Sequence, residues 1–99
     1  MGKGVLVSLG VVDPDEKEAF DVYAQSAPPL LLAIGGRPVG RYRFVEPIAG
    51  GAFPGTVFAM EFDDIDRLKG VFESDEYKAL IPYRDAAFKS LTLFIAEAF

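Results

Sequence analysis

The sequence predicts a small α+β domain in which a four-stranded antiparallel sheet carries helices on one face. Two observations support this fold class. The length of 99 residues suits one domain, 1–99, with one modest core. Strand and helix signals also follow one another in the order strand, helix, strand, strand, helix, strand.

The first half of the chain predicts a strand, a helix and a second strand. Residues 4–12 form an apolar, β-branched run that is typical of a strand. Asp13 and Pro14 suit the N-cap and the first turn, so we expect a helix from Pro14. The pair Pro28-Pro29 should bend or interrupt this helix before Gly35-Gly36 ends it. A second strand is expected over residues 37–46.

The second half predicts a hairpin partner, short helices and a closing strand. Residues 47–55 are rich in glycine and proline and should form a long loop, followed by an aromatic-rich strand at 56–62. Asp63 and Asp64 supply an N-cap for the next helix, and Ser74 starts a further short helix that Pro82 is expected to kink. Residues 90–97 alternate as a last strand.

This order of elements, with right-handed crossovers, is the split βαβ arrangement of ferredoxin-like folds. Alternation divides each strand between two faces. We expect the helix-covered face to carry Val5, Val7, Leu9, Val11, Phe58, Met60, Phe62, Leu91, Leu93 and Ile95. We expect the other face to carry Leu6, Ser8, Val12, Val39, Val57, Ala59, Thr92 and Phe94, together with Arg41, Arg43 and Glu61.

The second face is too apolar to remain in water without a reason. Exposed apolar patches of this extent usually mark an interface or a ligand site. Two copies of the sheet packed face to face would cover it, so the sequence predicts a homodimer. The alternative is a solvated sheet face with scattered apolar side chains.

Composition excludes several classes of function. A net charge of −5 does not fit a nucleic-acid binder or an anionic membrane surface, and the apolar run at residues 5–12 is too short to span a bilayer. We expect a cytoplasmic protein. The chain has no cysteine and no histidine, which excludes disulfides, thiolate nucleophiles, imidazole bases and the usual zinc sites. We therefore expect neither a metal nor a cofactor.

Three charged residues on the second sheet face are the catalytic candidates. If Glu61 were desolvated inside a barrel its pKa would rise, and it could then act as a general base. Arg41 or Arg43, on a neighbouring strand, could hold an anionic substrate or a developing enolate. The alternative is a purely structural ion pair.

Several segments resemble the DUF1330 family of the dimeric α+β barrel superfamily. They include Asp13-Pro14, Gly35-Gly36-Arg37 and Phe62, and they extend over residues 13–87. The most specific match lies around Ser74-Asp75-Glu76-Tyr77 and Tyr83-Arg84-Asp85-Ala86-Ala87. The resemblance implies a ferredoxin-like fold and a dimer whose sheets form a barrel, and it implies no particular activity.

Four further side chains are candidates for binding a ligand. Arg84, Tyr77 and Tyr83 could converge at the end of the second helical region, where a guanidinium would suit a carboxylate and a phenol would orient it. Tyr23 lies on the apolar side of the first helix. The alternative roles are backbone bonding for the arginine and core packing for the tyrosines.

Two hypotheses about function remain open. The first is a cofactor-free enzyme or binder of a small hydrophobic or carboxylate-bearing molecule, with its pocket at the sheet. The second is a structural or interaction protein whose apolar sheet face serves only dimerisation.

Overall fold

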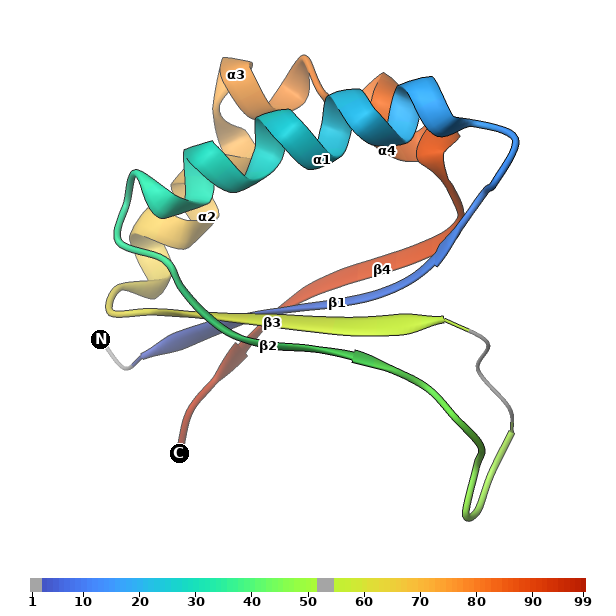
Figure 1. The fold of residues 1–99 in the computed structure, drawn as a ribbon. Helices are drawn as coiled ribbons and strands as arrows, with labels where there is room; N and C mark the ends of the chain where they lie inside the picture. The colour runs from blue at the N-terminus through green and yellow to red at the C-terminus, as the bar shows by residue number, and fades with distance from the viewer. Residues whose placement is uncertain (1–2, 52–54) are drawn as a thin grey trace.

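The computed structural model describes residues 3–51 and 55–99 and confirms the predicted fold class. Four strands form one antiparallel sheet in the order β2-β3-β1-β4, and all four helices cover the same face of it (Figure 1). The strands are β1 (Gly4–Val12), β2 (Arg37–Arg43), β3 (Thr56–Phe62) and β4 (Phe88–Glu97). The helices are α1 (Lys17–Leu32), α2 (Ile65–Glu73), α3 (Asp75–Lys78) and α4 (Ile81–Ala87). Of the predicted loop 47–55, residues 52–54 lie outside the described chain.

Helix α1 differs from the prediction at its start and at its prolines. It begins at Lys17, because Asp13 closes a separate turn instead of capping the helix: its side chain accepts the Asp15 backbone N–H at 3.0 Å. Pro28 and Pro29 lie inside an unbroken helix. The carbonyls that these prolines leave without a donor belong to residues 24 and 25, which are exposed, so water can satisfy them.

The caps of α2 and α3 were predicted correctly. The Asp64 carboxylate accepts the backbone N–H groups of Asp66 and Arg67 at 2.8 and 3.4 Å. The Ser74 hydroxyl accepts the Tyr77 backbone N–H at 3.2 Å. Pro82 lies in the first turn of α4, where its missing N–H costs little. Over residues 3–51 and 55–99, no helix is both long and apolar enough to cross a membrane.

The core lies between the sheet and the helices, and its membership corrects the predicted faces of β1. Leu6 is 3% exposed and pairs with Met60 on β3 and with Ile95 on β4, all on the helix-covered side. The prediction that placed Val5, Val7, Leu9 and Val11 on the helix-covered side is therefore wrong. The prediction that placed Leu6 and Ser8 on the other side is also wrong. Every position from Val5 to Leu9 except Ser8 is apolar, so alternation could not choose the face. The buried cluster comprises Leu6, Leu31, Met60, Phe62, Leu68 and Val71.

The sheet face away from the helices, called the open face below, is consequently more apolar than predicted. Val7 lies between Ala59 and Phe94 of the two neighbouring strands, and Leu9 lies between Val57 and Thr92. Residues directly opposite on antiparallel strands share a face, so these side chains form one continuous surface. Figure 1 shows this face without any helix over it.

Candidate functional site

A chain of hydrogen bonds links two phenols to one guanidinium beneath α4. The Tyr23 and Tyr77 hydroxyl oxygens are 2.8 Å apart, and Arg84 Nη1 donates to the Tyr77 hydroxyl at 3.2 Å. Arg84 Nε also donates to the Asp85 carboxylate at 3.2 Å. Tyr77 is 2% exposed, whereas the Arg84 side chain is 25% exposed. This series of hydrogen bonds is therefore buried at Tyr77 and reaches solvent at Arg84.

Local structure brings these residues together. The Ser74 cap starts α3 so that Tyr77 turns into the core, where its ring packs edge-on against Phe72, with the ring centroids 4.7 Å apart. Arg84 follows on α4, seven residues later, and its Cζ lies 5.8 Å from the centroid of the Tyr77 ring. Helix α1 packs along α4 and supplies Tyr23. The sequence analysis grouped Arg84 with Tyr77, and the fold brings these two residues into contact.

The surroundings shift the pKa values of Tyr23 and Arg84 in this hydrogen-bonded cluster. Burial raises the pKa of the Tyr23 phenol, and the hydrogen bond to Tyr77 raises it further. Burial lowers the pKa of the Arg84 guanidinium, but the contacts with Tyr77 and Asp85 outweigh it, so the net direction is upward. The cluster thus presents neutral Tyr23 behind a permanently charged arginine.

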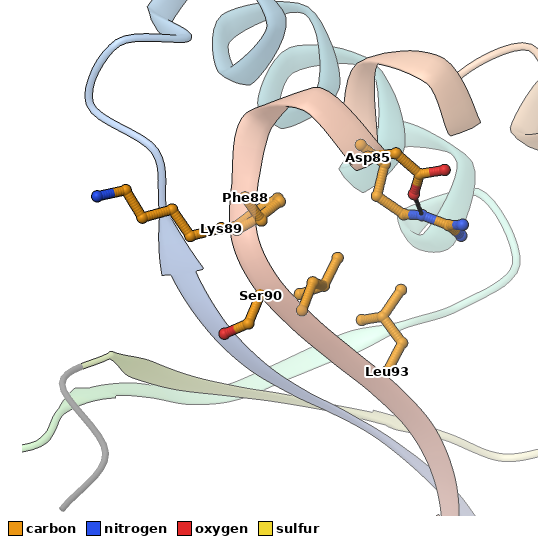
Figure 2. Close-up of a pocket in the computed structure, with 7 residues that line it drawn as sticks. Asp85, Phe88, Lys89, Ser90 and Leu93 are labelled. Atoms are coloured by element: carbon orange, nitrogen blue, oxygen red, sulfur yellow. Dashed lines mark hydrogen bonds and ion pairs between the residues drawn. The ribbon is translucent and has the colours of Figure 1, made fainter.

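A cavity of about 450 Å³ opens beside this arginine, at the corner where α4 leads into β4 (Figure 2). In Figure 2, Asp85 lies on the same side of the chain as Leu93, whereas Lys89 extends away from them. Arg84 forms an ion pair with Asp85 and lines the cavity together with Leu93. The lining residues are Arg84, Asp85, Phe88, Lys89, Ser90, Leu91 and Leu93.

A second cavity of about 460 Å³ continues along β4 toward α2. It shares Arg84 and Leu93 with the first cavity, so these two side chains stand at the boundary between them. Most of its remaining wall is apolar. It is lined by Leu6, Lys69, Phe72, Glu73, Arg84, Leu93, Phe94 and Ile95. Each volume falls within the range typical of small-molecule sites.

The structure does not bring Glu61 together with Arg41 or Arg43. Arg41 pairs with Phe58 and Arg43 pairs with Thr56, whose side chains lie on the helix side of β3, while Glu61 points to the open face. The cause is an irregularity between Pro38 and Gly40, which inserts one residue and reverses the alternation of β2. The expected pairing of these three residues is wrong.

Glu61 instead bonds to an arginine that sequence reasoning missed. Arg37 Nη2 donates to the Glu61 and Asp63 carboxylates at 3.0 Å each, and Lys3 Nζ is 3.8 Å from Glu61. The Arg37 hydrogen bond and the charge of Lys3 lower the pKa of Glu61, opposite to the expected rise. Arg37 directly follows Gly35-Gly36, and its position opposite Glu61 follows only from the strand register.

The fourth ligand candidate lies apart from the cluster. The Tyr83 side chain is 43% exposed and lines neither cavity. In the part of the chain that the structure describes, no three acidic side chains gather in a way that could hold a metal ion. The candidate site therefore consists of the two cavities along β4, with Arg84 between them and Tyr77 and Tyr23 behind it.

The sheet order and the helix layer define a protein of the ferredoxin-like α+β class. The model of the DUF1330 family, described as a domain of unknown function, matches residues 7–99, and the chain belongs to this family. The predicted resemblance is thereby confirmed. Among curated proteins, none matches this chain significantly.

Solved structures with the same fold come from several bacteria. A protein of unknown function from Rhodopseudomonas palustris aligns with a TM-score of 0.80 at 19% identity, over 99% of this chain and 83% of that one. An EthD family protein from Bacillus halodurans aligns with a TM-score of 0.62 at 30% identity, over 98% and 99% of the two chains. A protein from Bacteroides fragilis described as dimeric, of unknown function and of ferredoxin-like fold, aligns with a TM-score of 0.61 at 15% identity, over 99% and 98%.

Proposed function

We propose that this protein binds a small anionic molecule in the cavities along β4, with Arg84 as the residue that holds the negative group. The observation that carries this proposal is the position of Arg84. Its Nη1 and Nε are fixed by Tyr77 and Asp85, and the side chain stands at the boundary of both cavities while remaining 25% exposed. A cation already held in place loses little conformational freedom when a ligand arrives.

The chemistry of the guanidinium favours a carboxylate. Arginine has five N–H donors, and the hydrogen bonds to Tyr77 and Asp85 use Nη1 and Nε. Among the described residues, none accepts a hydrogen bond from Nη2. A planar carboxylate can take this donor, and its charge is attracted by a guanidinium that never loses its proton. Glu61 has no part in this proposal, because it points away from both cavities.

The proposal is tested by titrating the protein with butanoate at pH 7, with ¹⁵N NMR of arginine Nε and isothermal titration calorimetry as readouts. We expect the Arg84 Nε signal to shift on saturation and Arg84→Gln to weaken binding at least tenfold. Arg67→Gln is the matched control, because Arg67 is an exposed arginine on α2 that lines neither cavity. Circular dichroism checks that both variants are folded. Equal binding by wild type and folded Arg84→Gln would overturn the proposal.

We also propose that two copies of the chain pack through their open faces to form a homodimer. Support comes from the continuous apolar surface around Val7 and from the segment that leaves β2, which extends beyond the open face in Figure 1. In that segment Val45 and Ile48 are 93% and 97% exposed. The Bacteroides fragilis protein with the same fold is described as dimeric.

Native mass spectrometry tests ligand binding and dimer assembly in one measurement. A dimer with an additional small mass supports both proposals. A dimer that carries no ligand and binds no carboxylate favours a protein whose apolar face serves assembly alone. A monomer would contradict the homodimer while leaving the test of Arg84 unaffected.

A further inference from the structure

We infer that the ligand is an amphipathic monocarboxylic acid whose carboxylate bonds to Arg84 and whose short apolar chain lies in the second cavity, against Leu93, Phe72 and Ile95. This inference rests on the proposed binding at Arg84 and adds the class of ligand and its direction along β4.

The two cavities differ in the chemistry of their walls, and this difference gives the ligand its direction. The first cavity combines Arg84 and Asp85 with Ser90 and Lys89. The second is lined by five apolar residues, and besides Arg84 its charged residues are Lys69 and Glu73, both on α2. These two carry opposite charges and are both exposed, so together they add no net charge to that of Arg84. An apolar chain therefore fits the second cavity better than a second charged group.

Arg84 and Leu93 belong to both cavities, so a ligand held by the arginine can enter the second cavity directly. Leu93 and Ile95 lie on the helix side of β4, two residues apart, which corresponds to about 7 Å along a strand. This distance suits a short alkyl chain. Phe72 closes the cavity from α2, where its ring packs against Tyr77.

The carboxylate of the ligand and its apolar chain are recognised by different parts of the site. The carboxylate is recognised by a guanidinium whose position is set by Tyr77 and Asp85, while the chain is recognised through apolar area. Each methylene that leaves water contributes roughly a fourfold gain in affinity at most. Affinity should therefore rise with chain length until the chain passes Ile95, and an alcohol of the same length should bind far more weakly than the acid.

The experiment compares acetate, butanoate, hexanoate and octanoate, with 1-hexanol as the uncharged probe, by calorimetry and by NMR of the purified protein. We expect every acid to shift the Arg84 Nε signal, and only the longer acids to shift the backbone amides of Leu93, Phe94 and Ile95. Affinity should increase about threefold to fourfold per added methylene between butanoate and hexanoate, and hexanol should bind at least tenfold more weakly than hexanoate.

A variant that fills the second cavity tests the tail separately. Glu73→Trp places a large ring at the exposed rim of that cavity, and we expect it to reduce the affinity for hexanoate to that for acetate. Glu76→Trp is the matched control, because Glu76 is exposed on α3 and lines neither cavity. It should retain the dependence on chain length.

The outcomes distinguish this inference from the proposed function. Binding of all acids with no dependence on chain length, or a Glu73→Trp variant that still prefers hexanoate, would overturn the inference and leave Arg84 as the anion site. Hexanol binding as well as hexanoate would overturn the role of the carboxylate. No shift of Arg84 Nε with any acid would overturn the proposed function itself.

Discussion

The guanidinium of Arg84 lies over the ring of Tyr77 and bonds to its hydroxyl, so one buried residue holds the arginine in two ways. The Arg84 Cζ is 5.8 Å from the ring centroid, and Nη1 is 3.2 Å from the phenol oxygen. Tyr77 is itself held by the ring of Phe72 and by the hydroxyl of Tyr23. The direction of the arginine is therefore determined by the core of the protein as well as by its neighbour Asp85.

Tyr77→Phe removes the hydroxyl and keeps the ring, so it tests the hydrogen bonds alone. We expect the free energy of unfolding to fall by about 1–3 kcal/mol, because a hydrogen bond to a charged donor is lost and the partly buried Tyr23 hydroxyl loses its partner. Urea denaturation measures the change. Tyr83→Phe, at an exposed tyrosine, is the control and should shift the midpoint very little. Equal effects of the two substitutions would contradict a structural role for the Tyr77 hydroxyl.

The ion pairs of Glu61 predict how stability changes with pH. The hydrogen bond from Arg37 and the charge of Lys3 lower the pKa of Glu61 in the folded state, so the folded protein binds this proton less readily than the unfolded chain does. The stability that these ion pairs contribute is fully present above the pKa of Glu61 in the unfolded chain, near 4.5. It is lost as the pH falls below this value and through the lowered pKa of the folded state. Carbon NMR of the Glu61 carboxyl group measures the titration directly.

Two arginine variants test which arginine lowers the pKa of Glu61. Arg37→Gln should move the Glu61 titration upward, because it removes the larger of the two causes. Arg41→Gln should leave it unchanged, because Arg41 pairs with Phe58 and lies on the other side of the sheet. A Glu61 titration that responds to Arg41 instead would restore the arrangement expected from the sequence and contradict the register of β2.

Local signals were sufficient for most of the fold. The carboxylate of Asp64 and the hydroxyl of Ser74 act within three residues of their own positions, so the helices that they cap can be predicted from short segments. The prolines of α1 show the limit of this reasoning. Pro28 and Pro29 oppose a helix locally, but the buried Ala27 and Leu31 anchor it to the core on either side. Tertiary packing outweighed the local preference.

The faces of the sheet depended on partners that are distant in the sequence. In β1 the side chains of Val5, Leu6 and Val7 are all apolar, so only the pairing of Leu6 with Met60 and Ile95 decides which of them is buried. In β2 one inserted residue near Val39 reversed the expected side of Arg41. The contact between Arg84 and Tyr77 was predictable from their closeness in the sequence, but the bond between Tyr23 and Tyr77 joins residues 54 positions apart.

The corrected faces of β1 predict that substitutions at two adjacent residues change different properties, the stability of the subunit at Leu6 and the assembly of the proposed dimer at Val7. Leu6→Ala should reduce the free energy of unfolding by about 2–5 kcal/mol, because it leaves a void in a core where Leu6 is 3% exposed. Val7→Lys should leave the subunit folded but weaken the proposed dimer, because it places a charge in the middle of the open face. Urea denaturation and analytical ultracentrifugation separate the two effects. A Val7→Lys protein that remains a stable dimer would contradict assembly through this face.

The closeness of α1 to the sheet gives a further prediction at Gly36, where the chain turns from the helix toward β2. A Cβ atom at this position would lie 2.6 Å from Met60 Sδ, 2.8 Å from the Leu31 carbonyl oxygen and 2.8 Å from Phe62 Cε2. All three neighbouring residues belong to the buried cluster, and the Leu31 carbonyl oxygen also accepts the Gly36 N–H at 3.1 Å. The neighbours cannot all move aside without disturbing the core.

Gly36→Ala should therefore lower the free energy of unfolding by about 1–3 kcal/mol or more, as overpacking of a close contact does. Gly70→Ala is the matched control, because Gly70 lies inside α2 with nothing within 4 Å of its added Cβ. That substitution should stabilise the protein by about 0.5–1 kcal/mol, since alanine has the higher helix propensity. Urea denaturation of both variants at one protein concentration measures the difference. If Gly36→Ala were as stable as Gly70→Ala, the chain at Gly36 could not lie this close to Met60, and the packing of this turn against the core would have to be different.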